Sequence, residues 1–165
     1  MLDTARYRNG MAMLAGAVNV ITTDGPSGKA GFTATAVCTV TDQPPTLLVC
    51  MNRSSYAHQF FVGNGVLCVN LLSAEQQALS AVFSNREMSM DERFARHAFS
   101  LLETGSPALA EALVSFDCRI TQTHELGSHT VFYCEVLEMQ QGESRPGLVY
   151  FNRSYHQLGN ACGAG

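Results

Sequence analysis

The sequence has no tryptophan, no cluster of Lys or Arg, and no long uninterrupted run of apolar residues. Charged side chains make up 15% of the 165 residues, and the formal net charge is -4. Nucleic acids are bound by clustered positive charge, so no nucleic-acid partner is expected. A membrane-spanning helix needs about 20 apolar residues, and a signal peptide needs a charged start before an apolar run. Since neither is present, we predict a cytoplasmic protein without a membrane partner.

The motifs of several common cofactor and catalytic sites are missing as well. There is no GxGxxG after a strand and no GxxxxGKS/T, which argues against the usual dinucleotide and P-loop phosphate sites. The sequence contains neither GxSxG nor HExxH, and its five His residues lack the spacing of zinc ligands. A metal-dependent enzyme is therefore not expected.

The six cysteines form no CxxC and no other close pair. Five of them lie in apolar, strand-like segments. Free buried thiols in a reducing compartment are the simplest interpretation. Because the number is even, disulfides or a metal site stay open as alternatives.

No shift in composition and no repeat divides the chain. We expect a single domain over residues 1–158 and a disordered tail over 159–165. Alternating patterns predict strands over 17–23, 31–41, 46–52, 66–72, 112–126, 129–141 and 147–158, the last with a short turn. Turns between neighbouring strands imply antiparallel pairing. The predicted fold class is mainly β with short helices, as an antiparallel barrel whose closure removes exposed edges.

Helical spacing of apolar residues predicts short helices over residues 2–14, 54–65 and 73–84. Each begins with residues suited to capping, which are Asp3 and Thr4, Ser54 or Ser55, and Ser73. Between residues 85 and 105 the pattern is polar and mixed, and we expect a lid-like loop or a short helix there.

The strand that begins GFTATAVCTV has little bulk on either face. One face is mostly small and carries Phe32, Ala34, Ala36 and Cys38, while the other carries Thr33, Thr35, Val37 and Thr39. A flat ring lying along a strand needs small side chains beneath it and hydroxyls or backbone amides at its polar edge. The alternative is a tight barrel in which small residues permit closure.

The segment MNRSSYAH sets two hydroxyls and Arg53 at the start of a predicted helix. A helix N-terminus with hydroxyls and a nearby cation suits a phosphate group. The alternative is an ordinary helix cap beside a solvated arginine. In HELGSHT, His129 follows a glycine turn and is a plain loop residue unless the turn reaches the same cavity. Together these features indicate a cavity for a planar, phosphate-bearing ligand such as FMN.

A family resemblance rests on six segments that follow one another along the chain, GFTATAVCTVTDQPPTLLVCMNRSS, LCVNLLS, ERF, ALVSFDCRI, GSH and GLVYFNRSYH. Over about residues 8–158, the sequence is similar to the short-chain flavin reductase family. Its members are the reductase components of two-component flavin-dependent monooxygenases. The resemblance implies an antiparallel split β-barrel of the FMN-binding type, usually a homodimer with flavin near the subunit interface.

The resemblance also implies a reaction, in which hydride passes from NADH or NADPH to FMN or FAD and reduced flavin leaves for a monooxygenase partner. The cofactors carry the hydride chemistry, and the protein holds the two rings about 3–3.5 Å apart. No side chain is then an indispensable acid or base. The lack of a clustered Arg/Lys pair for a 2′-phosphate favours NADH.

Matching the family's motifs residue by residue assigns the flavin-binding positions of this sequence. The ring edge falls to Thr33, Ala34, Thr35 and Ala36, and the ribityl chain to Cys50 and Asn52. The phosphate loop falls to Arg53, Ser54 and Ser55, with Arg86 as a second phosphate or nucleotide contact. Phe83 matches an aromatic residue near the flavin.

The same matching assigns the catalytic position to His129, in the family's Gly-x-His turn near the nicotinamide. Arg153 and Tyr155 match the C-terminal segment that closes over the site. Two rival interpretations remain. The barrel could be a non-catalytic flavin carrier or sensor, or a relative that binds haem or pyridoxal phosphate.

Overall fold

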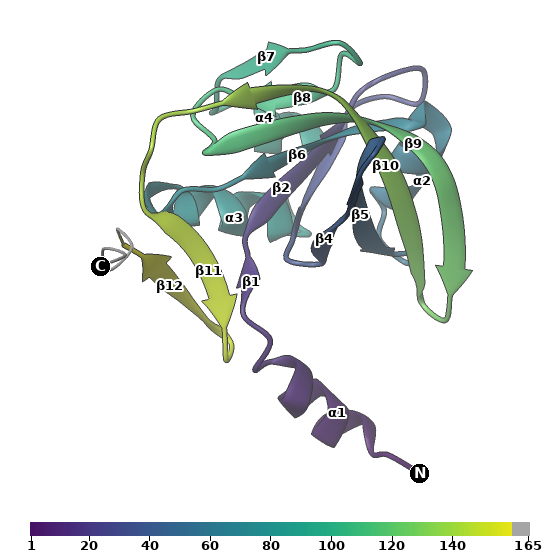
Figure 1. The fold of residues 1–165 in the computed structure, drawn as a ribbon, viewed down its shortest axis with the longest axis vertical. Coiled ribbons are helices and arrows are strands. Elements are labelled where there is room, and N and C mark those ends of the chain that lie inside the picture. The colour runs from purple at the N-terminus through teal and green to yellow at the C-terminus, as the bar shows by residue number, and fades with distance from the viewer. Residues whose placement is uncertain (160–165) are drawn as a thin grey trace.

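The structure is a computed structural model that describes residues 1–159 (Figure 1). It is mainly β, with four short α-helices in the described part of the chain, as the sequence predicted. The expected tail lies outside the described residues except for Gly159.

Seven strands form the main sheet, and every neighbouring pair in it is antiparallel. In sheet order they are β3 (Ala30–Ala34), β2 (Asn19–Thr23), β6 (Val66–Leu71), β9 (Val114–Leu126), β10 (His129–Gln141), β5 (Pro45–Asn52) and β4 (Val37–Asp42). The strands β3 and β4 are therefore the two edges, although only residues 35–36 separate them in the sequence.

The predicted continuous strand over 31–41 is wrong at its centre. The chain turns at Thr35, whose carbonyl accepts a 2.8 Å hydrogen bond from the backbone N–H of Val37. This turn shifts the alternation by one residue. Phe32 and Ala34 before the turn, and Val37 after it, all pack against the same core.

Two small sheets complete the β structure. β1 (Gly16–Ala17), β11 (Gly147–Phe151) and β12 (Ser154–Leu158) form one, and β7 (Phe99–Leu101) and β8 (Pro107–Leu109) form the other. The final segment is a hairpin and not one strand with a turn. Its turn residues Asn152 and Arg153 have φ of 47° and 61°, the left-handed conformation that tight antiparallel turns require.

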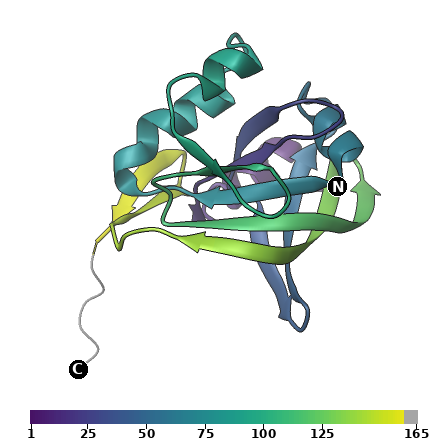
Figure 2. The same ribbon diagram turned by 90° about the horizontal axis from the view of Figure 1, so that it is seen from above.

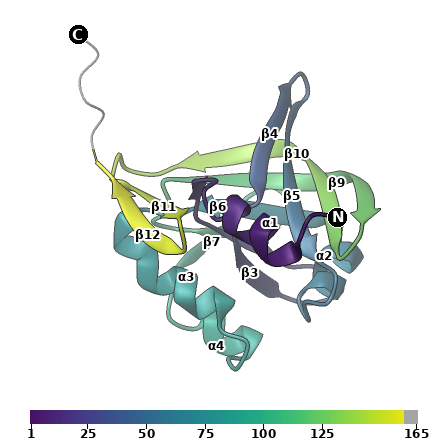
Figure 3. The same ribbon diagram turned by 90° about the horizontal axis from the view of Figure 1, so that it is seen from below.

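The four helices are α1 (Thr4–Met11), α2 (His58–Asn64), α3 (Gln77–Ser84) and α4 (Met90–Phe94), and a 3-10 turn over Ala74–Gln76 precedes α3. Figures 2 and 3 show α3 and α4 on one side of the sheet, away from the β4–β5 hairpin. In Figure 1, α1 projects from the body of the molecule, and none of its residues is buried. Within residues 1–159, every helix is too short or too polar to cross a membrane.

The predicted cap of the second helix is wrong. Helix α2 begins at His58, and its N-cap residue Ala57 makes no side-chain hydrogen bond. The hydroxyl and backbone N–H of Ser54 both donate to Asn52 Oδ1 instead, so this serine builds a turn before the helix. The Asp3 cap of α1 is confirmed, because its carboxylate accepts from the Arg6 N–H.

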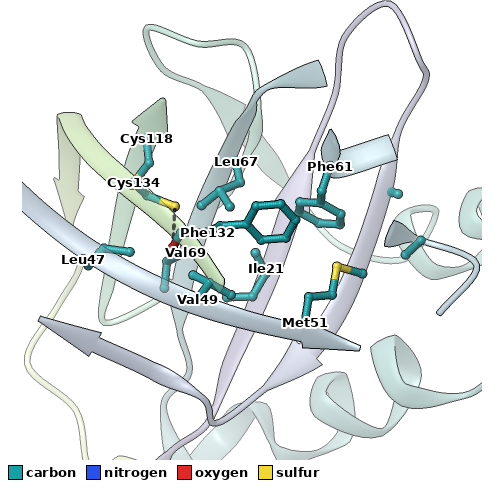
Figure 4. Close-up of a cluster of buried hydrophobic side chains, with 12 residues drawn as sticks. Ile21, Leu47, Val49, Met51, Phe61, Leu67, Val69, Cys118, Phe132 and Cys134 are labelled. Atoms are coloured by element: carbon teal, nitrogen blue, oxygen red, sulfur yellow. Dashed lines mark hydrogen bonds between the residues drawn. The ribbon is translucent and has the colours of Figure 1, made fainter. Parts of the chain in front are cut away.

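The main core is enclosed by the curved seven-stranded sheet and by α2 (Figure 4). It contains Phe61 of α2 and Phe132 of β10, both fully buried, and Phe61 packs edge-on against Phe32 at 5.2 Å. A second cluster, with Phe83 and Phe94 at its centre, joins α3 and α4 to the other side of the sheet. Both helices are also in direct contact with β3.

Candidate functional site

Two cavities receive most of the residues that the sequence analysis selected. The first, which we call the loop cavity, has a volume of about 530 Å³ and lies between the β5–α2 loop and the segment 86–93. Asn52, Ser54 and Ser55 line one side, and Arg86 lines the other. The structure thus brings together four predicted phosphate and ribityl contacts from segments more than 30 residues apart.

Asn52 organises the β5–α2 loop. Its Oδ1 accepts 2.9 Å and 2.8 Å hydrogen bonds from the backbone N–H and hydroxyl of Ser54, and its carbonyl accepts from the Ser55 N–H. Asn52 is also the last residue of β5, so the ladder with β10 anchors the loop. The strand end therefore presents the two serines at the cavity.

Arg53 does not line the loop cavity. Its guanidinium forms an ion pair with Glu125 of β9 at 2.5 Å, and both side chains are largely exposed. An exposed pair of this kind contributes little to stability. Arg53 is therefore close to the loop in sequence but held on its outer side.

The opposite wall of the loop cavity is set by helix α4. Ser89 caps this helix: its Oγ accepts from the Glu92 N–H, and its own N–H donates to Glu92 Oε2 at 2.7 Å. This reciprocal pair is the S-x-x-E capping box. The motif is visible in the sequence SMDE and favours the short helix over the lid-like loop, the two alternatives expected for this segment.

Arg93 follows in the same helix and was missed as a functional residue, although it lines the loop cavity. Its side chain reaches four backbone carbonyls. Nη1 donates to Gly31 and Phe83 at 3.1 Å each, Nη2 donates to Asn85 at 2.7 Å, and Nε donates to Met88 at 3.3 Å. Only the ERF motif pointed to this residue, and it gave no role.

The second cavity, which we call the strand cavity, has a volume of about 410 Å³ and lies against β3. Five predicted residues line it, which are Thr33, Ala34, Thr35, Arg153 and Tyr155. As β3 is an edge strand, its outer row of backbone N–H and C=O groups is left without a strand partner. These groups are available to a ligand with a polar edge.

A hydrogen-bonded chain crosses the floor of the strand cavity. Thr33 Oγ1 donates to the Ser80 carbonyl of α3 at 2.7 Å, and Ser80 Oγ lies 2.7 Å from the Tyr155 hydroxyl. Tyr155 also packs edge-on against Tyr150 at 5.2 Å. The C-terminal hairpin is thereby connected to β3 through α3.

Arg153 borders the same cavity from the hairpin turn. Its Nη2 donates to Asn9 Oδ1 of α1 at 2.6 Å, and the neighbouring Asn152 N–H donates to the Ala12 carbonyl. The predicted closing segment is thus in contact with the N-terminal helix.

Phe83 does not reach either cavity. It is 1% exposed and packs in the second core cluster, edge-on against Phe94 at 5.1 Å. A Cβ added at Gly31 would lie 2.6 Å from the Phe83 ring, so α3 and β3 approach closely at this point. Phe83 sets the position of β3 and lies beneath the strand that lines the cavity.

Ala36 and Cys50 are adjacent to each other but line neither cavity. The Cys50 N–H donates to the Ala36 carbonyl at 3.0 Å, one residue beyond the end of the β4–β5 ladder. Burial, and secondarily the nearby Cys38 thiol, raise the pKa of Cys50. The five cysteines of the described part are all free, and residues 1–159 hold no group of three His, Cys, Asp or Glu side chains that could bind a metal.

His129 is exposed at the start of β10, directly opposite Asn52 in the ladder. Gly127, with φ of 57°, forms the tight turn before it, and the Ser128 hydroxyl lies 2.8 Å from His129 Nδ1. His129 does not line the loop cavity, but its ladder partner Asn52 does. The predicted turn therefore ends beside the predicted phosphate loop.

The two cavities flank the C-terminal end of α3. Ser84 lines the strand cavity and Arg86 lines the loop cavity, two residues further on. The arrangement suits one elongated ligand with a flat polar-edged ring at β3 and an anionic group at the serine loop.

The sequence and the fold both match known proteins. Residues 11–159 match the family described as "Flavin reductase like domain". The protein "FMN reductase (NADH) RutF" of Variovorax paradoxus strain S110 is 54% identical over 158 residues, which cover 96% of this chain and 87% of the relative.

Two solved structures have the same fold. BorF, the flavin reductase component of a bacterial two-component tryptophan halogenase, has a TM-score of 0.88 at 28% identity, over 94% of this chain and 98% of that one. The styrene monooxygenase flavin reductase of Pseudomonas putida S12 has a TM-score of 0.83 at 27% identity, over 93% of this chain and 97% of that one.

Proposed function

Because the chain belongs to the flavin reductase-like family, we propose that it transfers hydride from NADH to FMN and supplies reduced flavin to a partner monooxygenase. The observation that carries the proposal is the loop cavity, where the Ser54 and Ser55 side chains face Arg86. The name of the Variovorax relative agrees with the predicted reductase activity, and it favours FMN and NADH over FAD and NADPH.

The proposed phosphate position is the loop cavity. The Ser55 hydroxyl and the Arg86 guanidinium are hydrogen-bond donors that line this cavity, whereas the Ser54 hydroxyl and N–H already donate to Asn52. Bonds from a charged donor such as Arg86 to phosphate oxygens are the strong kind. Asn52 holds the serine turn in place, and the α4 capping box holds the wall that carries Arg86. The donor set therefore fits a phosphate group.

The proposed ring position is the strand cavity. The outer backbone edge of β3 and the Thr33 and Thr35 side chains supply polar groups for the ring edge, and Tyr155 closes the far side. When bound, the flavin ring supplies the hydride acceptor. Backbone donors at the ring edge would stabilise negative charge that develops there.

The proposed role of His129 is to position the nicotinamide. It is exposed at the turn next to Asn52, where a second nucleotide can approach from solvent. Hydride transfer requires the two rings to be held about 3–3.5 Å apart, and this is a demand on binding and orientation. We therefore assign no acid–base step to His129.

We also propose that the sheet closes as a split barrel and that two copies form a homodimer. Helix α1 supports the dimer, because its apolar side chains, which include Tyr7 and Met11, are about half exposed and pack against no core in this chain. An apolar cavity of about 510 Å³ beside β4 is a second surface that a partner copy could cover. A measured solution mass equal to one chain would contradict the dimer.

The oxygenase partner is proposed to receive reduced flavin by diffusion, without a stable complex. The free cysteines of the described residues agree with a reducing cytoplasmic location. The rival interpretation, a flavin carrier or sensor without catalysis, shares the loop cavity but needs no nicotinamide position beside His129.

The test is an assay of purified protein with NADH and excess FMN in air, following the loss of NADH absorbance. Parallel reactions contain FAD in place of FMN and NADPH in place of NADH. Rapid oxidation of NADH that depends on FMN is the expected result. Binding of FMN with no oxidation of either nicotinamide would overturn the reductase and leave the carrier or sensor.

A further inference from the structure

Arg93 is a buried cation without a carboxylate partner. Arg93 is 8% exposed. The ion pairs among residues 1–159 involve Arg53 and Arg145 but not Arg93. All four of its hydrogen bonds go to neutral backbone carbonyls. An arginine in such surroundings keeps its proton, so the positive charge is real and is not neutralised by the protein.

Burying an unpaired charge is costly, and proteins normally compensate it with an opposite charge or a ligand. Burial lowers the pKa of the Arg93 guanidinium, which shows the direction of this penalty. Arg93 lines the loop cavity, so the uncompensated charge borders the cavity that is proposed to hold the phosphate. A dianionic phosphate would provide the missing counter-charge.

The hydrogen bonds of Arg93 also fix the cavity wall. Its Nη2 and Nε reach Asn85 and Met88, the residues on either side of Arg86 and Glu87. Its Nη1 reaches Gly31 of β3 and Phe83 of α3, so the wall is attached to both elements. A guanidinium has five N–H donors, and four are used, which leaves one on Nη2 without a partner among the described residues.

We propose that Arg93 is a positioning residue for the flavin phosphate. It holds the 85–88 segment that carries Arg86. Its buried charge makes the loop cavity bind a flavin with a phosphate monoester more tightly than a flavin without one. This inference rests on the proposed function, because it takes FMN as the ligand of the loop cavity. It extends that function by naming the feature that distinguishes FMN from riboflavin.

The direct test compares two probes, FMN and riboflavin, which differ only in the phosphate. Their dissociation constants are measured by quenching of flavin fluorescence, without any nicotinamide, for the wild type, Arg93→Gln and Arg93→Lys. We expect the preference of the wild type for FMN to fall about tenfold in Arg93→Gln, because a charge-assisted contribution is lost. Arg93→Lys keeps the charge and should keep more of the preference.

Arg96→Gln is the matched control. Arg96 is exposed, follows Arg93 by three residues and borders a different cavity, so the substitution makes the same change in net charge. The ratio of the riboflavin and FMN dissociation constants of Arg96→Gln should match that of the wild type. If Arg93→Gln weakens FMN and riboflavin equally, Arg93 has only a structural role and the inference is overturned.

A second measurement uses the wild type and does not depend on the folding of any variant. Hydrogen exchange of the backbone amides at 85–89 is followed with FMN, with riboflavin and without ligand. Slower exchange with FMN than with riboflavin supports the inference, and equal exchange overturns it.

A wild type that binds both flavins with equal affinity overturns the phosphate assignment of the loop cavity itself, whereas a preference retained in Arg93→Gln overturns only the role of Arg93.

Discussion

Asn52 and His129 face each other at the end of the β5–β10 ladder, the first as the last residue of its strand and the second as the first residue of its own. The Asn52 side chain holds the turn at Ser54, and His129 directly follows the two-residue turn that contains Gly127. Because both turns start from one rung of the ladder, the proposed positions for flavin phosphate and nicotinamide are fixed relative to each other by sheet geometry.

Replacement of His129 by alanine should slow the reaction without abolishing it. His129 makes no buried contact, and its proposed contribution is to nicotinamide binding, so the expected change is a several-fold rise in KM for NADH with a smaller change in kcat. Steady-state assays at saturating FMN measure both. His124→Ala, at an exposed position in the same hairpin, is the control and should behave like the wild type. Complete inactivity of a folded, FMN-binding His129→Ala protein would contradict the positioning role.

Replacement of Asn52 by alanine should weaken FMN binding by about tenfold or less. The change removes two hydrogen bonds that hold the Ser54 turn, each worth about 1 kcal/mol. The same loss should lower the melting temperature by only a few degrees, because 1 kcal/mol shifts it by about 2–4 °C in a domain of this size. Calorimetric titration with FMN, together with thermal unfolding, separates the two effects. A large loss of stability with unchanged affinity would contradict the assignment of this turn to the ligand.

Replacement of Gly31 by alanine should destabilise the fold. The added Cβ would lie 2.6 Å from Phe83 Cε1 and 3.2 Å from the Ile21 carbonyl, and neither is a flexible group. Overpacking of this kind costs about 1–3 kcal/mol in the free energy of unfolding. Denaturant titration measures the loss.

The double variant Gly31→Ala with Phe83→Leu should lose less stability than the sum of the two single variants, because the smaller side chain removes the clash. Gly10→Ala is the matched control, since nothing lies within 4 Å of its added Cβ and alanine favours the helix. An undiminished stability of Gly31→Ala would show that the close approach of α3 and β3 can relax.

Replacement of Tyr155 by phenylalanine tests the chain of hydrogen bonds beneath the strand cavity. The hydroxyl lies 2.7 Å from Ser80 Oγ, and a neutral hydrogen bond contributes about 0.5–1.5 kcal/mol. A double-mutant cycle with Ser80→Ala should show coupling between the two positions in FMN affinity. Additive effects would mean that the two hydroxyls act independently.

Alkaline pH should destabilise the protein through its buried thiols. Burial raises the pKa of Cys134 from 9.0 to about 12, and it raises those of Cys68 and Cys118 further. The folded protein therefore keeps these thiols protonated where the unfolded chain ionises them. Their contribution to stability is complete below pH 9 and is lost as the pH rises from 9 towards 12.

Chemical denaturation between pH 8 and 10.5, with Cys134→Ala as the comparison, measures this slope. The variant should have a lower stability at pH 8, because a buried group is removed, and a shallower decline with rising pH. Parallel declines in the two proteins would contradict the assignment to Cys134.

Local patterns in the sequence predicted much of the fold. Alternation identified the long hairpin of β9 and β10 within two residues, and the Asp3 cap and the glycine turn before His129 are also as predicted. These features depend on neighbouring residues, so a single sequence contains them. The serine turn after β5 was not predicted, because Ser54 or Ser55 was assigned to a helix cap, whereas Ser54 donates its hydrogen bonds back to Asn52.

Features set by distant contacts were not predicted. The turn at Thr35 depends on Val37 packing against a core built from other strands, and the pattern of small residues alone could not show it. Arg93 is polar in sequence and would be assigned to the surface, yet it is buried because carbonyls from β3, from α3 and from the segment after α3 surround it. The resemblance placed Phe83 near the ligand, whereas its neighbours bury it.

The attachment of helix α1 connects the strand cavity to the surface proposed for the dimer. The helix is held by the Asn9–Arg153 contact and by the Asn152–Ala12 hydrogen bond, and Arg153 borders the strand cavity. A partner copy that covered the apolar side of α1 would therefore also set the position of Arg153. The reductase activity per chain should then rise with protein concentration and level off once all chains are paired. Dilution of the protein should therefore lower its specific activity.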